Sequence, residues 1–123
     1  MKFMCLAYEE EEKLNALSQS EWSALRSETI AYVETLRASG RLVTTYALQS
    51  TRTAATVRVR AGRRLVTDGP FAEAKEMVGG FFLIEATDRA EAIELAARWP
   101  SAAFGAIEVR PVEEALRPDK RYG

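Results

Sequence analysis

Two short segments that are apolar on both sides place the strongest limit on the fold of this chain. Phe3 to Tyr8 reads FMCLAY, and Phe81 to Ile84 reads FFLI. Successive side chains of a strand point to opposite faces, so both segments present apolar groups on both faces. A half-exposed antiparallel sheet alternates apolar and polar residues instead. We therefore expect two strands of a sheet that is covered on both faces.

Two helices are predicted, one after each of these two strands. The first begins after Ser18, which has capping-box spacing to Glu21, and ends near Gly40. The second is capped by Asp88 and is stopped by Pro100. Both contain apolar residues at helical spacing, so each presents one face to a core.

The remaining strands are predicted at 41–48, in a hairpin at 55–67, and at 107–112. The run DGPF, residues 68–71, is the strongest turn signal, and a short helical turn is predicted at 72–76. The acidic run 9–12 is interpreted as a solvated turn.

The predicted order is β-α-β, a β-hairpin insertion, then β-α-β. This order indicates an α+β, ferredoxin-like fold with an antiparallel sheet and both helices on one face. We expect a single domain over residues 1–123, with 113–123 as a flexible tail.

Two helices can cover only one face of such a sheet, which leaves the second apolar face exposed. A second copy packed sheet against sheet would cover it, with roughly 800 Å² buried on each subunit. We therefore expect a homodimer. The alternative is that the 55–67 hairpin or the C-terminal segment folds over this face.

Composition excludes several kinds of chemistry. The chain has 47% hydrophobic and 28% charged residues and a net charge of −1, so nucleic acid and acidic membranes are not expected partners. Cys5 is the only cysteine and there is no histidine, so neither a disulfide, a Cys-based zinc site nor a His-based mechanism is expected. We expect no metal and no cofactor. No signal-peptide or membrane-spanning pattern is present, which favours a cytoplasmic location.

One segment resembles a known family. The run VTDGPFAEAKE at 66–76, followed by GGFF at 79–82 and IEVRP at 107–111, resembles the DGPF subgroup of the YCII-related proteins. The opening MKFMCLAY and the strand TVRVR fit the same resemblance. It implies a ferredoxin-like subunit that dimerises into an α/β barrel. Members resemble small bacterial proteins without an established reaction, some of them labelled as enzymes and some as transcription-related.

The chain departs from the family pattern at several positions. YCII relatives are often credited with a His–Asp pair, which a chain without histidine cannot form. Tyr46 stands near the place where some relatives carry a histidine, and the resemblance makes it a candidate for part of that role. Further departures are Ala74, Met77, Val78 and Phe82.

Asp68 is the first candidate for a catalytic group. It ends a predicted strand and could act as a general base near Arg58 or Arg60. In the alternative interpretation its carboxylate accepts a backbone N–H in an Asx-turn. Glu73 could join Asp68 as a second carboxylate, or lie on a solvated face. The residues predicted to bind a ligand are Arg58, Gly69, Phe71, Lys75 and Arg110.

Two further sequence patterns each allow two interpretations. Between Thr35 and Thr67 the chain holds seven arginines and no acidic residue. These arginines either bind an anionic partner or protect an edge strand from aggregation. The pair Gly79–Gly80 either admits a ligand to the backbone or forms a bulge.

Three functions are compatible with these features. The first is a small-molecule binding protein or metal-free acid/base enzyme, with a pocket between the sheet and the dimer interface. Asp68, Tyr46, Arg58 and Glu73 would line that pocket. The second is a regulatory module that binds an acidic partner through the arginine-rich hairpin. The third is a structural dimer without a site.

Overall fold

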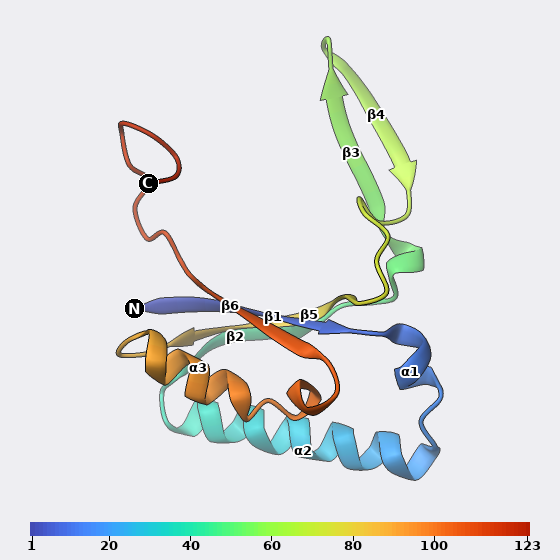
Figure 1. Cartoon of the computed structure of the whole chain (residues 1–123), viewed down its shortest axis with the longest axis vertical. Helices are drawn as coiled ribbons and strands as arrows, with labels where there is room; N and C mark the ends of the chain where they lie inside the picture. The colour runs from blue at the N-terminus through green and yellow to red at the C-terminus, as the bar shows by residue number, and fades with distance from the viewer.

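A four-stranded antiparallel sheet with two helices on one face forms the body of the molecule (Figure 1). The computed structural model describes residues 1–123. Its elements are β1 (Lys2–Glu9), α1 (Glu11–Asn15), α2 (Gln19–Ala38), β2 (Leu42–Ala47), the 3₁₀ turn η1 (Thr51–Thr53), β3 (Ala55–Arg60), β4 (Arg63–Asp68), β5 (Met77–Glu85), α3 (Arg89–Ala97), the 3₁₀ turn η2 (Pro100–Ala103) and β6 (Ala106–Pro111).

The two segments that are apolar on both sides are strands, as predicted, and they form the centre of the sheet. The strand order is β2-β5-β1-β6, and every neighbouring pair is antiparallel. This is the order expected of two split β-α-β units. The α+β class and the antiparallel sheet are therefore confirmed.

The core lies between the sheet and the two helices. Every second residue of β1 (Phe3, Cys5 and Ala7) is buried, and Phe82 and Ile84 of β5 are fully buried beside them. The helices contribute Leu36, Ala92, Leu95 and Ala96, and Ala86, just after β5, completes the core.

Both helices begin at the predicted caps. The Ser18 side chain accepts from the backbone N–H of Glu21, and the Glu21 carboxylate accepts from the backbone N–H of Ser18, which completes the capping box of α2. Asp88 accepts from the backbone N–H of Glu91 at the start of α3. None of the helices has the length and apolar character that a membrane crossing requires.

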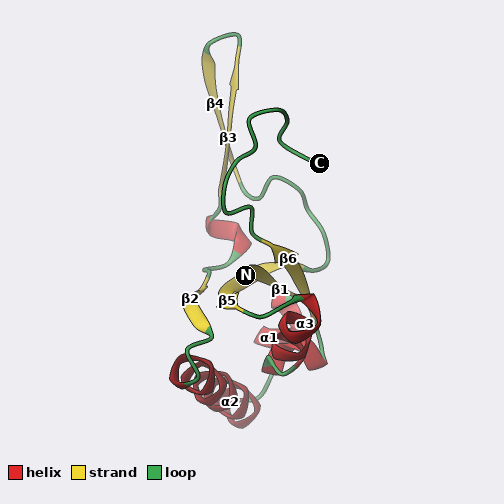
Figure 2. Ribbon diagram, turned by 90° about the vertical axis from the view of Figure 1, so that its left-hand side faces the viewer, coloured by secondary structure: helices red, strands yellow, loops and turns green.

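The second face of the sheet lacks a cover within this chain. Met4, Leu6, Phe81 and Leu83 alternate with the core residues and point away from the helices; we call this set the open face. In Figures 1 and 2 neither the β3–β4 hairpin nor the C-terminal segment lies along the sheet. The predicted alternative, in which the hairpin folds over this face, is therefore wrong.

Instead, β3 and β4 form a separate two-stranded sheet that projects from the body (Figure 2). We call Ala55–Asp68 the arm. Its turn has positive φ angles at Ala61 (50°) and Gly62 (73°), which is the geometry of a tight hairpin whose twist matches its strands. The predicted hairpin is confirmed, with one more residue at its end.

Two local predictions are wrong. No helical turn forms at 72–76, because the chain runs without regular structure from Gly69 to Glu76. The acidic run at 9–12 is not a solvated turn. Glu9 ends β1, and Glu11 begins α1 with its carboxylate bound to the η1 turn. Residues 113–123 form no helix or strand, and their flexibility stays a prediction.

Candidate functional site

A cleft of about 250 Å³ lies between α2 and the helix-facing side of the sheet. It combines successive turns of α2 with the adjoining ends of β1, β2 and β5. Most of its lining is apolar, and no Lys or Arg contributes to it. The lining residues are Ala7, Glu9, Trp22, Leu25, Thr29, Val33, Thr45, Tyr46, Ala47, Gly79, Gly80, Phe81, Trp99 and Ser101.

Glu9 is the only ionisable carboxyl group in this cleft, which we call the Glu9 cleft. It follows Phe3, Cys5 and Ala7 on the buried side of β1, so the alternation of the strand directs an acid toward the helices. Its carboxylate is half-buried and forms no hydrogen bond or ion pair. Burial, with a smaller effect from the Glu11 charge, raises the pKa of Glu9 above its usual range.

Gly79 provides the space for this carboxylate. The pairing of β1 with β5 shifts register between Ala7 and Tyr8, which leaves Gly79 as the extra residue of a bulge. A Cβ atom on Gly79 would lie 1.8 Å from Oε1 of Glu9. The bulge interpretation of the glycine pair is therefore confirmed, and the bulge brings the Glu9 carboxylate against bare backbone.

Aromatic packing fixes one wall of the cleft. The Trp99 ring stacks on Phe82, with 4.0 Å between centroids and 9° between planes. Tyr32 meets Trp99 edge-on at 6.2 Å, and its hydroxyl donates to the backbone oxygen of Leu95 at 2.5 Å. Trp22, on α2, also lines the cleft and is 45% exposed. Contacts with Phe82 and Tyr32 thus hold the Trp99 ring in place.

Cys5 contributes packing and no chemistry. It is fully buried, and burial raises the pKa of its thiol to about 12, so the reactive thiolate is absent at neutral pH. No group of three His, Cys, Asp or Glu side chains is gathered in a way that could hold a metal ion.

Of the predicted site residues, only Tyr46 lines the Glu9 cleft. Tyr46 pairs with Phe81, a member of the open face, and the two rings lie 6.0 Å apart. Tyr46 therefore borders the cleft from its strand and directs its ring to the open-face side. The predicted set as a whole does not converge on one place, because its members belong to the body, the base of the arm and the far edge strand.

The DGPF run lies at the base of the arm. Gly69 donates its N–H to the oxygen of Ala54 at 2.7 Å, which closes the hairpin. Asp68 is exposed and its side chain accepts no hydrogen bond, so the Asx-turn interpretation is wrong. Gly69 and Glu73 line a shallow basin of about 360 Å³, together with Thr51, Arg52, Pro70, Ala74 and Met77.

The remaining predicted ligand-binding residues are spread out. The Arg58 guanidinium lies over the Phe71 ring, 5.1 Å from its centre, while Lys75 is exposed and forms no ion pair. Arg110 lies on β6, with its Nε 3.8 Å from the Glu108 carboxylate. Glu108 also accepts from the Tyr8 hydroxyl at 3.0 Å, a bond that raises the pKa of Tyr8.

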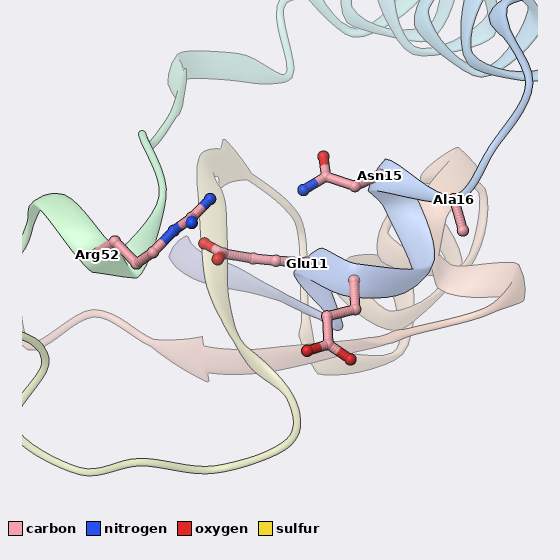
Figure 3. Close-up of a pocket in the computed structure, with 5 residues that line it drawn as sticks. Glu11, Asn15, Ala16 and Arg52 are labelled. Carbon is pink, nitrogen blue, oxygen red and sulfur yellow. The ribbon is translucent and has the colours of Figure 1, made fainter.

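A larger hollow of about 650 Å³ is open and polar (Figure 3). Glu11 and Arg52 point toward one another across it, and Glu12, Asn15 and Ala16 complete its lining. The Glu11 carboxylate is already occupied, because it accepts from the Thr51 N–H at 2.8 Å and from the Ser50 hydroxyl at 2.9 Å. These bonds lower the pKa of Glu11. Its role is to join α1 to the η1 turn, which makes the Glu9 cleft the stronger candidate.

Sequence reasoning missed Glu9, although a signal for it existed. The period-two alternation that buries Phe3, Cys5 and Ala7 continues to Glu9, which predicts an acid on the buried side. Its position beside Gly79 depends on the strand register and could not be read from spacing alone.

Comparisons with known proteins agree on the family. The model of the YCII-related domain matches residues 1–115. An uncharacterized protein of Rhizobium meliloti (strain 1021) is 35% identical over 114 residues, covering 91% of this chain and 92% of the relative. Among solved structures, 5-chloro-2-hydroxyhydroquinone dehydrochlorinase (TftG) from Burkholderia phenoliruptrix, in complex with 2,5-dihydroxybenzoquinone, is similar with a TM-score of 0.57. That likeness covers 94% of this chain and 96% of the other at 17% identity, so it concerns the fold. The chain belongs to the YCII-related family.

Proposed function

We propose that this protein binds a small, uncharged, largely apolar molecule in the Glu9 cleft and that Glu9 accepts a proton from it. The observation that carries this proposal is the unpartnered, half-buried carboxylate in a cleft otherwise lined mainly by apolar side chains. Buried carboxylates normally have partners, so one without a partner is a candidate for function.

The surroundings of Glu9 define the chemistry. A carboxyl group whose pKa is raised is a better proton acceptor than an ordinary one. Thr29 and Thr45 line the cleft, and their hydroxyls donate to the backbone oxygens of Leu25 and Phe81, so toward a ligand their oxygens can only accept. The Ser101 hydroxyl also lines the cleft and can donate or accept. Since no Lys or Arg lines the cleft, an anionic ligand would lack a counter-charge. The favoured ligand is therefore neutral and carries an acidic hydroxyl or C–H group.

The comparison with TftG supports a small-molecule site in this fold. That enzyme was solved with 2,5-dihydroxybenzoquinone, a small ring bearing hydroxyl groups. A single ring of this size can be accommodated in a cleft of about 250 Å³.

A ligand screen by thermal shift tests the proposal, with hydroxylated aromatic and quinoid compounds as probes. Ligand at roughly 100 times its Kd should stabilise the protein by about 2.7 kcal/mol. We expect Glu9→Gln to abolish this shift, and Glu12→Gln, an exposed acid three residues away, to retain it. Unchanged shifts in Glu9→Gln would contradict the assignment of Glu9.

The pH dependence of unfolding provides a test that needs no ligand. The folded-state pKa of Glu9 is raised, so Glu9 favours the folded state below the ordinary value of 4.5, and this contribution is lost as pH rises through the folded pKa. Glu9→Gln should therefore raise Tm relative to wild type at pH 7 and lose this advantage near pH 4. An equal Tm difference at both pH values would contradict a raised pKa.

We also propose the sheet-to-sheet homodimer and membership of the DGPF subgroup. The open face supports the dimer, because its apolar side chains have no cover within the chain. Two such sheets facing each other would form the α/β barrel that the family resemblance implies. Leu83→Glu, at the centre of this face, should give a monomer in sedimentation velocity. A variant that sediments as a dimer would contradict this interface.

A further inference from the structure

We propose that the arm docks its apolar side on a second copy of the chain. This inference rests on the proposed homodimer and assigns a second contact within it. In this arrangement the arm of each copy extends along the side of its partner, while the two open faces pack together.

The two sides of the arm are different. Val57 lies opposite Val66 in the strand pairing, so these two residues and Val59 share one side, which we call the valine side. Their exposed fractions are 61% for Val57 and Val59 and 54% for Val66. Arg64 lies opposite Val59 and so belongs to this side too, and Ala55 and Asp68 lie at its base. The other side carries Arg58, Arg60, Arg63 and Leu65.

The chain itself does not cover the valine side. No hydrogen bond or ion pair connects residues 57–67 with the sheet or the helices. A two-stranded hairpin is marginally stable when it stands alone in water. Three exposed valines gathered on one side of such a ribbon, with Arg64 beside them, therefore indicate a contact with another surface.

The position of the arm indicates which surface that is. The arm rises on the side of the sheet away from α2 and α3, which is also the side of the open face (Figure 1). A second copy that packs on the open face must therefore lie next to the arm. One partner molecule can cover both apolar surfaces, so no additional partner is needed.

Charge also favours a second copy. The arm contains four arginines and one aspartate, a net charge of +3, and the whole chain carries −1, so the rest of the chain carries −4. None of Arg58, Arg60, Arg63 and Arg64 forms an ion pair within the chain. A basic arm is attracted to an acidic body, so an identical chain is a complementary partner.

Adjacent residues on opposite sides of the arm provide a matched test. Val66 and Leu65 are similarly exposed, at 54% and 48%, but point to opposite sides. We expect Val57→Thr/Val66→Thr, which preserves side-chain shape, to weaken the dimer about tenfold or more in sedimentation equilibrium, because apolar contact area is lost. Leu65→Thr should leave the dissociation constant within about twofold.

Cysteine reactivity reports on the same contact without relying on the loss of binding. Because Cys5 is buried, a thiol introduced by Val59→Cys or Leu65→Cys is the only accessible one. We expect the Val59→Cys thiol to react with a colorimetric disulfide reagent several-fold more slowly when the dimer is populated, and the Leu65→Cys thiol to react at a constant rate.

The outcomes separate the two proposals. A wild-type protein that stays monomeric would overturn both the homodimer and the docked arm. A stable dimer whose affinity is unaffected by Val57→Thr/Val66→Thr, with a constant rate for Val59→Cys, would overturn the docked arm and leave the homodimer standing.

Discussion

The body and the arm place the same kinds of residue in opposite environments. In β5 the apolar residues Phe82 and Ile84 are fully buried, whereas Val57 and Val59 of β3, at the same spacing, stay 61% exposed. Helices cover the side of β5 that carries Phe82 and Ile84, and no element of the chain covers the valine side of the arm. Alternation specifies a strand and the side that needs a cover, and it does not specify which molecule supplies that cover.

Of the positions compared, we expect substitution of Phe82 to lower the free energy of unfolding the most. Phe82 is fully buried and stacks on Trp99, so Phe82→Ala leaves a cavity and should lower the free energy of unfolding by about 3–5 kcal/mol. Urea denaturation measures this change. Phe71→Ala, at a site that is 76% exposed, is the control and should cost less than about 0.5 kcal/mol. If both variants lowered the free energy of unfolding equally, the proposed difference in packing between the body and the base of the arm would be wrong.

The bulge at the edge of the body should be intermediate in sensitivity. Gly79→Ala introduces a methyl group at the position of the Glu9 carboxylate and should cost about 1–3 kcal/mol. In a Glu9→Ala background the same substitution should cost much less, because the side chain in conflict is absent. A double-mutant cycle measures this coupling. Additive effects would show that Gly79 is required for its backbone alone.

The arm should be the least sensitive region in the dilute monomer. Val66→Ala removes two methyl groups that contact little within the chain, so the free energy of unfolding should change by less than about 0.5 kcal/mol. The measurement is urea denaturation at a concentration below the dissociation constant of the dimer. A loss above about 1 kcal/mol would indicate that the arm packs on its own body.

Sequence patterns predicted most of the fold because the decisive signals are local. Ser18 with Glu21, Asp88 with Glu91, and the turn after Arg60 each depend on residues that are close in the chain. The strand assignment of the two segments that are apolar on both sides followed from their composition, since only buried strands tolerate apolar groups on both sides. Their pairing with each other at the centre of the sheet was not predicted.

The candidate site was harder to predict because it depends on long-range geometry. The position of Glu9 beside Gly79 requires the register of β1 against β5 and a one-residue bulge. The DGPF run was conspicuous in the sequence, yet Asp68 lies at the base of the arm while Tyr46 lies at the cleft. A motif indicates its own turn, and it does not indicate how far that turn lies from other polar groups.

The arm also has a consequence for the rate at which the chain folds. β2 must pair with β5 across the whole connection from Ala47 to Met77, and the arm makes up about half of this connection. Once Ala55 pairs with Asp68, the residues of the arm no longer add to the length of the flexible loop. Halving a loop lowers its closure cost by about 0.6 kcal/mol, and a hairpin forms within about 1–10 μs. Whenever the arm hairpin is formed, it therefore shortens the loop that must close before β2 pairs with β5.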